Sequence, residues 1–143
     1  MPILGIDYGD KKVGLAISDS KNKFALPLEI IANRGDNNLA GEISKICSRY
    51  EISRVVVGIP LTLRGKEKDY QSEQTKKILG FAKKLSERLP MPVVCEDERF
   101  TSKMASQRRE KIKTKGEDHD VAAMLILQSY LDRNSQVQNS NAE

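Results

Sequence analysis

The opening of the chain places a carboxylate inside an apolar strand–turn–strand unit, which restricts the folds open to it. Residues 3–19 read ILGIDYGDKKVGLAISD, two apolar runs around a turn rich in charge and glycine. The alternation of a strand puts Gly5 and Asp7 on one face and Leu4 and Ile6 on the other. A buried, unpaired carboxylate is costly, so two explanations for Asp7 stay open. It is either a ligand of a bound cation or a salt-bridged or turn-capping residue at a strand end.

The rest of the chain has the pattern of an α/β domain. Strands are expected over residues 3–7, 13–19, 24–32 and 54–60 and from residue 92 into the acidic run 96–98; helices are expected at about 39–50, 78–89, 101–112 and 119–131. This βββαβαβα order, with the helix at 101–112 as an extra short one, predicts a mixed five-stranded sheet. One half of that sheet is antiparallel, the other half is parallel, and helices cover both faces.

The parallel half is where functional groups are expected to gather. Residues 54–60, RVVVGIP, form a continuous β-branched run typical of a strand buried on both faces of a parallel sheet. Asp7 and Glu98 both fall at the carboxyl ends of such strands and are therefore expected to meet. A further acidic cluster, GEDHD at 116–120, opens the last helix. It either stabilises the helix start through the macrodipole or joins Asp7 and Glu98 around two divalent cations.

Length and charge limit the function classes without choosing one. The 143 residues fit one compact domain, which we expect over 1–132, followed by a polar, disordered tail over 133–143. Lysine and arginine number 24 against 20 aspartates and glutamates, for a net charge of +4. This modest excess permits a polyanionic partner but does not require one.

Cysteine usage and hydropathy point to a cytoplasmic protein. Cys47 and Cys95 are far apart in sequence and lie in apolar segments, so we expect both to be reduced and buried. No CxxC pair is present, which disfavours a structural zinc site. No stretch approaches membrane-spanning length, and no membrane partner is expected.

Four segments together resemble the motifs of a known family. They are DYGDKKVGLAISD, VVVGIPLTLRG, DERFTSKMA and AAMLILQSYL, and in order and spacing they resemble the YqgF/RuvX family of ribonuclease-H-like nucleases over about residues 2–132. The resemblance implies a ribonuclease-H-like fold and a phosphodiester hydrolase that processes the 5′ end of pre-16S ribosomal RNA during ribosome biogenesis. The family is also similar to Holliday-junction resolvases, so a resolvase acting in DNA recombination and repair is the alternative.

The resemblance also implies a set of catalytic, metal-binding residues. The family's first-strand aspartate corresponds to Asp7 and the glutamate of its DER motif to Glu98, with Mg²⁺ or Mn²⁺ as cofactor. At the third position this chain has His119 where the family usually has aspartate, with Asp118 and Asp120 on either side. A neutral imidazole suits Mg²⁺ less well than a carboxylate, so either His119 is a ligand or Asp120 or Asp118 replaces it. Asp120 is preferred, because at the helix start it can direct a carboxylate toward the strand ends. His119 can instead be a solvated capping residue. Its departure from the family pattern also leaves open a second interpretation, a nucleic-acid-binding module whose nuclease site has decayed.

Basic residues around the expected site suggest where nucleic acid binds. The candidates are Lys11, Lys12, Arg64, Arg108 and Arg109. They either form a phosphate-binding rim, which supplies most nonspecific nucleic-acid affinity, or an ordinary solvated surface. The expected partner is pre-rRNA or branched DNA. A symmetric junction favours a homodimer, whereas trimming an RNA end is compatible with a monomer.

Overall fold

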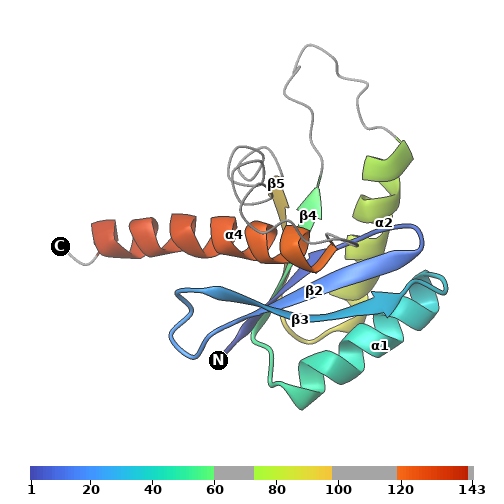
Figure 1. Cartoon of the computed structure of the whole chain (residues 1–143), viewed down its shortest axis with the longest axis horizontal. Helices are drawn as coiled ribbons and strands as arrows, with labels where there is room; N and C mark the ends of the chain where they lie inside the picture. Colours follow the sequence, from blue (N-terminus) through green and yellow to red (C-terminus); the bar gives the residue numbers. More distant parts are fainter. Residues whose placement is uncertain (60–72, 98–118, 142–143) are drawn as a thin grey trace, which may run out of the picture.

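The computed structural model describes residues 1–59, 73–97 and 119–141, with side chains over 1–59, 73–97 and 121–134. Its elements are β1 (Ile3–Asp7), β2 (Lys12–Ser18), β3 (Ala25–Ala32), α1 (Asp36–Arg49), β4 (Arg54–Ile59), α2 (Glu73–Arg88), β5 (Val93–Asp97) and α4 (His119–Asn141) (Figure 1). The predicted βββαβαβα order is confirmed. The short helix predicted at 101–112 lies outside the described residues.

The five strands form one mixed sheet in the order β3-β2-β1-β4-β5. β1 pairs antiparallel with β2, and β2 pairs antiparallel with β3, because short turns connect these strands. β4 and β5 add in parallel to β1, since a helix precedes each of them in the chain. The predicted division into an antiparallel and a parallel half is therefore confirmed.

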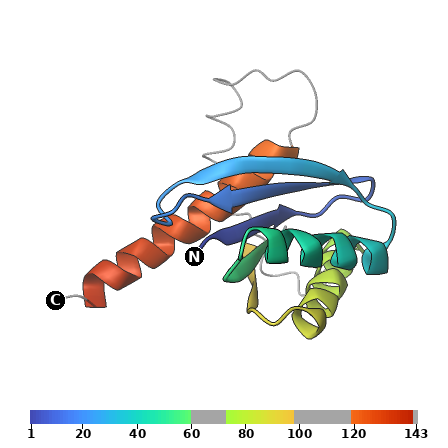
Figure 2. The same cartoon turned by 90° about the horizontal axis from the view of Figure 1, so that it is seen from below.

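Helices cover both faces of this sheet. Figure 2 shows α1 and α2 together on one side, where Phe81 and Leu85 of α2 pack with Leu4 and Ile6 of β1. On the other face Ile126, Leu127 and further residues of α4 pack in a second cluster with Val56 of β4. Strand alternation explains the two cores, since neighbouring side chains of β1 and β4 point to opposite faces.

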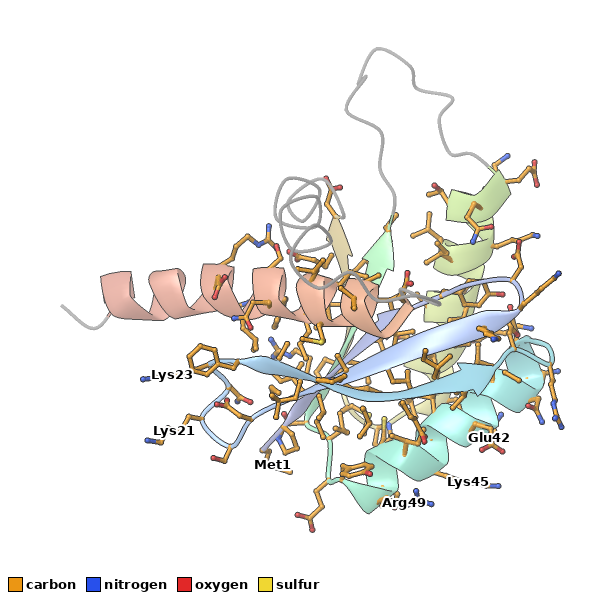
Figure 3. All side chains as sticks on the ribbon, in the orientation of Figure 1. Met1, Lys21, Lys23, Glu42, Lys45 and Arg49 are labelled. Carbon is orange, nitrogen blue, oxygen red and sulfur yellow. The ribbon has the colours of Figure 1, made fainter. Side chains whose placement is uncertain are left out.

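The outer face of α1 agrees with the amphipathic pattern of its sequence. Leu39, Ile43 and other apolar residues of α1 are buried against the sheet. Figure 3 shows Glu42, Lys45 and Arg49 projecting away from it. The helix starts earlier than predicted, at Asp36, directly after Gly35, whose φ of 103° favours glycine.

Two expectations about helix ends and burial are wrong. α4 does not end near Leu131 but continues to Asn141, and its C-terminal part extends beyond the sheet (Figure 1). The extension has a local reason, because no glycine or proline occurs between residues 119 and 141. The proposed domain boundary after residue 132 and a disordered tail stay predictions. Cys95, expected to be buried, is exposed, whereas Cys47 is buried as predicted.

Among the helices that the structure describes, none combines the length and apolar composition needed to cross a bilayer.

Candidate active site

Asp7 is the last residue of β1 and lies at the carboxyl end of the parallel strands. It is half-buried and pairs with Gly14 of β2. It shares a sheet face with Gly5, the face on which α4 packs. The carboxylate is therefore partly desolvated on the face of the sheet that α4 covers. A cation or hydrogen-bond donor that interacts with it offsets the cost of this desolvation.

The strand register brings a second carboxylate into the same row. Ile6 pairs with Val57, so Asp7 comes next to Gly58, and Gly58 pairs with Glu96 of β5. Side chains in one row of parallel strands point to the same face. Gly58, which lies between Asp7 and Glu96 in this row, has no side chain. No side chain of β4 therefore separates the two carboxylates.

Glu96 is fully buried and bound to α4. Its carboxylate accepts a hydrogen bond of 3.0 Å from Ser129 Oγ and forms an ion pair with Arg133 Nη2. Burial raises the pKa of Glu96, which Ser129 and Arg133 oppose and the neighbouring Asp97 reinforces. Glu96 is thus engaged in holding α4 to β5. The sequence marks Glu96 only as the first residue of the acidic run 96–98 that ends the strand, so its role does not follow from the sequence pattern.

The direction of α4 places its first residues toward Asp7. Ala123 and Leu127 lie over Gly5 of β1. Further along, Gln128 binds the β2–β3 connection, where its Oε1 accepts from the Ala25 N–H at 2.9 Å. That connection is beside the amino end of β1, because the Ile3 N–H donates to Ser18 Oγ at 2.8 Å. α4 therefore starts on the side of the carboxyl end of β1.

His119 and Asp120 are the first two residues of α4, so the helix backbone brings both to the Asp7 side of the sheet. Their side chains lie outside the described part of the molecule. Five further candidates lie entirely outside the described residues: Glu98, Asp118, Arg64, Arg108 and Arg109. The roles expected of them stay predictions.

The turn after Asp7 is fixed by contacts from both sides. The Tyr8 hydroxyl donates to Asp36 Oδ1 at 2.8 Å, and its ring lies 4.9 Å from that of Phe81. Asn33 Nδ2 donates to the Gly9 carbonyl at 2.7 Å. Burial is the largest cause of the raised pKa of Tyr8, so its hydroxyl keeps its proton. These contacts hold the backbone next to Asp7 in place.

Lys11 and Lys12 extend from this fixed turn and are exposed. Beside them, Asp10 Oδ1 lies 3.5 Å from Lys77 Nζ of α2. The two predicted phosphate-binding lysines therefore adjoin Asp7 on a turn that also contacts α2.

The residues present suit a hard divalent cation. Asp7, Glu98 and Asp120 offer carboxylate oxygens, the donors that Mg²⁺ and Mn²⁺ prefer, while His119 offers a softer nitrogen. Among the described side chains, those of residues 1–59, 73–97 and 121–134, no three histidine, cysteine, aspartate or glutamate residues are grouped closely enough to hold a metal. Of the four expected ligands, only Asp7 has a described side chain; those of Glu98, His119 and Asp120 lie outside the described part of the molecule.

Comparison with known families decides the relationship. The family model described as "RuvX: Holliday junction resolvase" matches residues 1–133. The chain belongs to this family. A "Putative pre-16S rRNA nuclease" of Sulfurihydrogenibium sp. is 41% identical over 136 residues, covering 92% of this chain and 90% of the relative. One from Orientia tsutsugamushi is 39% identical, with 98% and 87% covered.

Two solved structures of resolvases share this fold. Thermus thermophilus RuvC in complex with a Holliday junction substrate aligns with a TM-score of 0.64 at 15% identity, covering 94% of this chain and 96% of that one. The yeast mitochondrial Holliday junction resolvase Ydc2 gives 0.56 at 10% identity, covering 96% and 80%. At such identities the likeness concerns the fold, and it confirms the predicted ribonuclease-H-like architecture.

The match to the RuvX family model confirms the resemblance seen in the four motifs. This family is one of nucleases. The predicted class of enzyme, a hydrolase acting on phosphodiester bonds, agrees with this membership.

Proposed function

We propose that this RuvX protein hydrolyses phosphodiester bonds with divalent cations held at the carboxyl end of β1. The observation that carries the proposal is Asp7: a half-buried carboxylate at the end of a parallel strand, on the face where α4 begins. The residues that would hold the cations are Asp7, Glu98 and Asp120 or His119. Two divalent cations, when bound, supply an activated water and stabilise the leaving 3′ oxygen.

The chain's own residues orient and bind around that centre. Close packing of α4 on Gly5 fixes the distance between the helix start and β1. Glu96, bound to Ser129 and Arg133, holds the end of β5 to the same helix. Lys11 and Lys12 bind substrate phosphates from the turn beside Asp7.

The substrate that we propose is the 5′ end of pre-16S rRNA. The supporting observation is that relatives covering nearly the whole chain carry that name, at 31–41% identity. A Holliday junction is the second candidate. It is favoured by the description of the family and by the likeness in fold to RuvC bound to a junction.

The test is cleavage of end-labelled precursor rRNA and of a four-way DNA junction, each with Mg²⁺, Mn²⁺ or chelator. The native chain is compared with Asp7→Asn, and Glu42→Gln serves as a control because it neutralises one carboxylate on the outer face of α1 (Figure 3). We expect metal-dependent cleavage of one substrate by the native chain and by Glu42→Gln. Asp7→Asn should cut neither substrate while binding nearly as well.

Three results would change the proposal. Cleavage by Asp7→Asn at the native rate would remove Asp7 from the mechanism. Binding of both substrates without any cutting would identify a decayed site, and His119→Asp would then be tested for restored activity. Cleavage of the junction alone would replace rRNA by branched DNA as the substrate.

A further inference from the structure

The outward face of α2 carries four lysines with no carboxylate among them. Lys76, Lys77, Lys83 and Lys84 are all exposed. Spacings of three, four, seven and eight residues place side chains on one side of a helix, so the four lysines flank one stripe. No aspartate or glutamate occurs between residues 74 and 86. The other side of α2 is buried against the sheet.

Gly80 lies at the centre of this stripe, and nothing in the described structure requires a glycine there. A Cβ built at Gly80 meets no atom within 4 Å, and its φ is not in the left-handed region. Glycine in the middle of a helix is unfavourable compared with most other residues. What the missing side chain does provide is an open helix backbone that a ligand can approach closely.

The stripe continues toward the candidate active site. Lys77 Nζ lies 3.5 Å from Asp10 Oδ1 in the β1–β2 turn, next to the exposed Lys11 and Lys12. Figure 1 shows the β1–β2 turn beside α2. At the opposite end of α2 the basic side chain turns to α1 instead, since Arg88 Nη1 donates to the Asn37 carbonyl at 3.3 Å. The α2 lysines therefore extend from the turn beside Asp7, which Lys77 contacts, to Lys83 and Lys84 in the C-terminal half of the helix.

We propose that the α2 basic face, defined as Lys76, Lys77, Lys83 and Lys84 around Gly80, binds the phosphodiester backbone of the nucleic acid that is cut at Asp7. Charge complementarity selects a polyanion, and the open backbone at Gly80 accommodates a strand lying across the helix. Residues seven apart on a helix are about 10.5 Å apart along its axis, the length of about three nucleotide steps of a duplex. This inference rests on the proposed function and adds a binding surface to it.

The first test compares two charge reversals of equal size. Lys83→Glu with Lys84→Glu alters the α2 basic face, whereas Lys21→Glu with Lys23→Glu alters the β2–β3 turn, away from α2 (Figure 3). Binding of fluorescent precursor rRNA and of a four-way DNA junction is measured in chelator over a range of salt concentrations. We expect the α2 variant to bind at least about tenfold more weakly, with a salt slope reduced by about one to two. The β2–β3 variant should bind like the native chain.

Gly80→Leu provides a test in which binding and stability change in opposite directions. Leucine is a better helix former than glycine, and space is open at this position, so the melting temperature should stay the same or rise. Its side chain would nevertheless block the approach of a strand to the helix, so binding should weaken several-fold. Gly80→Ala should also keep or raise the melting temperature, and its smaller side chain should weaken binding less than leucine does.

Native-like binding by both the Lys83/Lys84 variant and Gly80→Leu would overturn the proposal and leave α2 as a solvated face. Equal losses from the two charge reversals would also overturn it, because net charge rather than this surface would then govern binding. These outcomes are separate from the proposed function, which depends on whether Asp7→Asn cuts.

Discussion

At the scale of single residues, side chains that bind backbone fix the connections around the sheet. Asp19 shows this in the turn between β2 and β3, where its Oδ1 accepts from the Lys23 N–H at 2.8 Å and the Phe24 N–H at 3.3 Å. These backbone donors, Lys23 first, lower the pKa of Asp19 below its usual value. The turn matters for the site because Gln128 Nε2 of α4 donates to the Lys23 carbonyl at 2.8 Å. A local carboxylate thus helps to shape the surface on which α4 is seated.

The lowered pKa predicts how stability depends on pH. The charged form of Asp19 is favoured in the folded chain, so its contribution is present above its unfolded pKa of 3.8 and is lost as the pH falls through the folded value. The native chain should exceed Asp19→Ala in free energy of unfolding at pH 6, and this difference should shrink below pH 3.8. Denaturant unfolding at several pH values measures it. Asp19→Asn keeps an acceptor oxygen but has no titrating group at this position, so its stability relative to Asp19→Ala should not vary with pH. A constant difference between the native chain and Asp19→Ala would contradict the explanation.

At the scale of elements, the site depends on how closely α4 approaches β1. A Cβ at Gly5 would lie 2.8 Å from Leu127 Cβ and 3.1 Å from the Ala123 carbonyl oxygen. Both contacts are with the rigid part of the helix, so any side chain at Gly5 must push α4 away from the strand that ends at Asp7. Glycine at this position allows the helix start to lie near the candidate catalytic carboxylate.

Gly5→Ala should therefore weaken both stability and catalysis. Overpacking of this kind typically costs about 1–3 kcal/mol, and we expect a loss in that range in denaturant unfolding. Cleavage should fall further than the unfolded fraction accounts for, because α4 moves relative to Asp7. Gly41→Ala is the matched control, since its Cβ would meet only the flexible Arg88 side chain at 3.4 Å. Equal stability of the two variants would show that α4 can shift without cost.

At the scale of the whole molecule, α4 joins the two halves of the sheet. It lies against β1, β2 and β3, and through Ser129 and Arg133 it also holds the end of β5. Figure 2 shows it on a course separate from that of α1 and α2, with its C-terminal part beyond the strands. Arg133 is the residue just past the predicted boundary at 132, and the family match also ends at 133. We therefore expect the domain to extend at least to this ion pair.

Two truncated chains test where the domain ends. A chain of residues 1–132 lacks Arg133 and leaves the buried carboxylate of Glu96 without its cation, whereas a chain of residues 1–137 keeps the pair. Removing one partner of a buried pair is strongly destabilising, and since Arg133 is half-exposed we expect about 2–3 kcal/mol. Denaturant unfolding should give near-native stability for 1–137 and a clear loss for 1–132. Equal stability of the two chains would place the boundary where the sequence pattern put it.

The sequence by itself determined those features that depend on local periodicity. Alternation and β-branched runs defined the five strands, helical spacing defined the buried sides of α1 and α2, and short turns against helical crossovers determined which strands pair antiparallel or parallel. The place of Asp7 at the end of β1 followed from the same alternation. The four motifs added the family, because several short segments in fixed order are far more specific than any one of them.

Only the tertiary structure decided which distant residues meet. Glu96 and Arg133 are partners across 37 positions, and the contact of Gly5 with α4 spans more than a hundred, so no local pattern marks either. Exposure of Cys95 follows from its place on β5, which within the described residues is an edge strand paired only with β4. Periodicity tells which face of an element is buried, but what covers that face depends on contacts formed when the elements pack together.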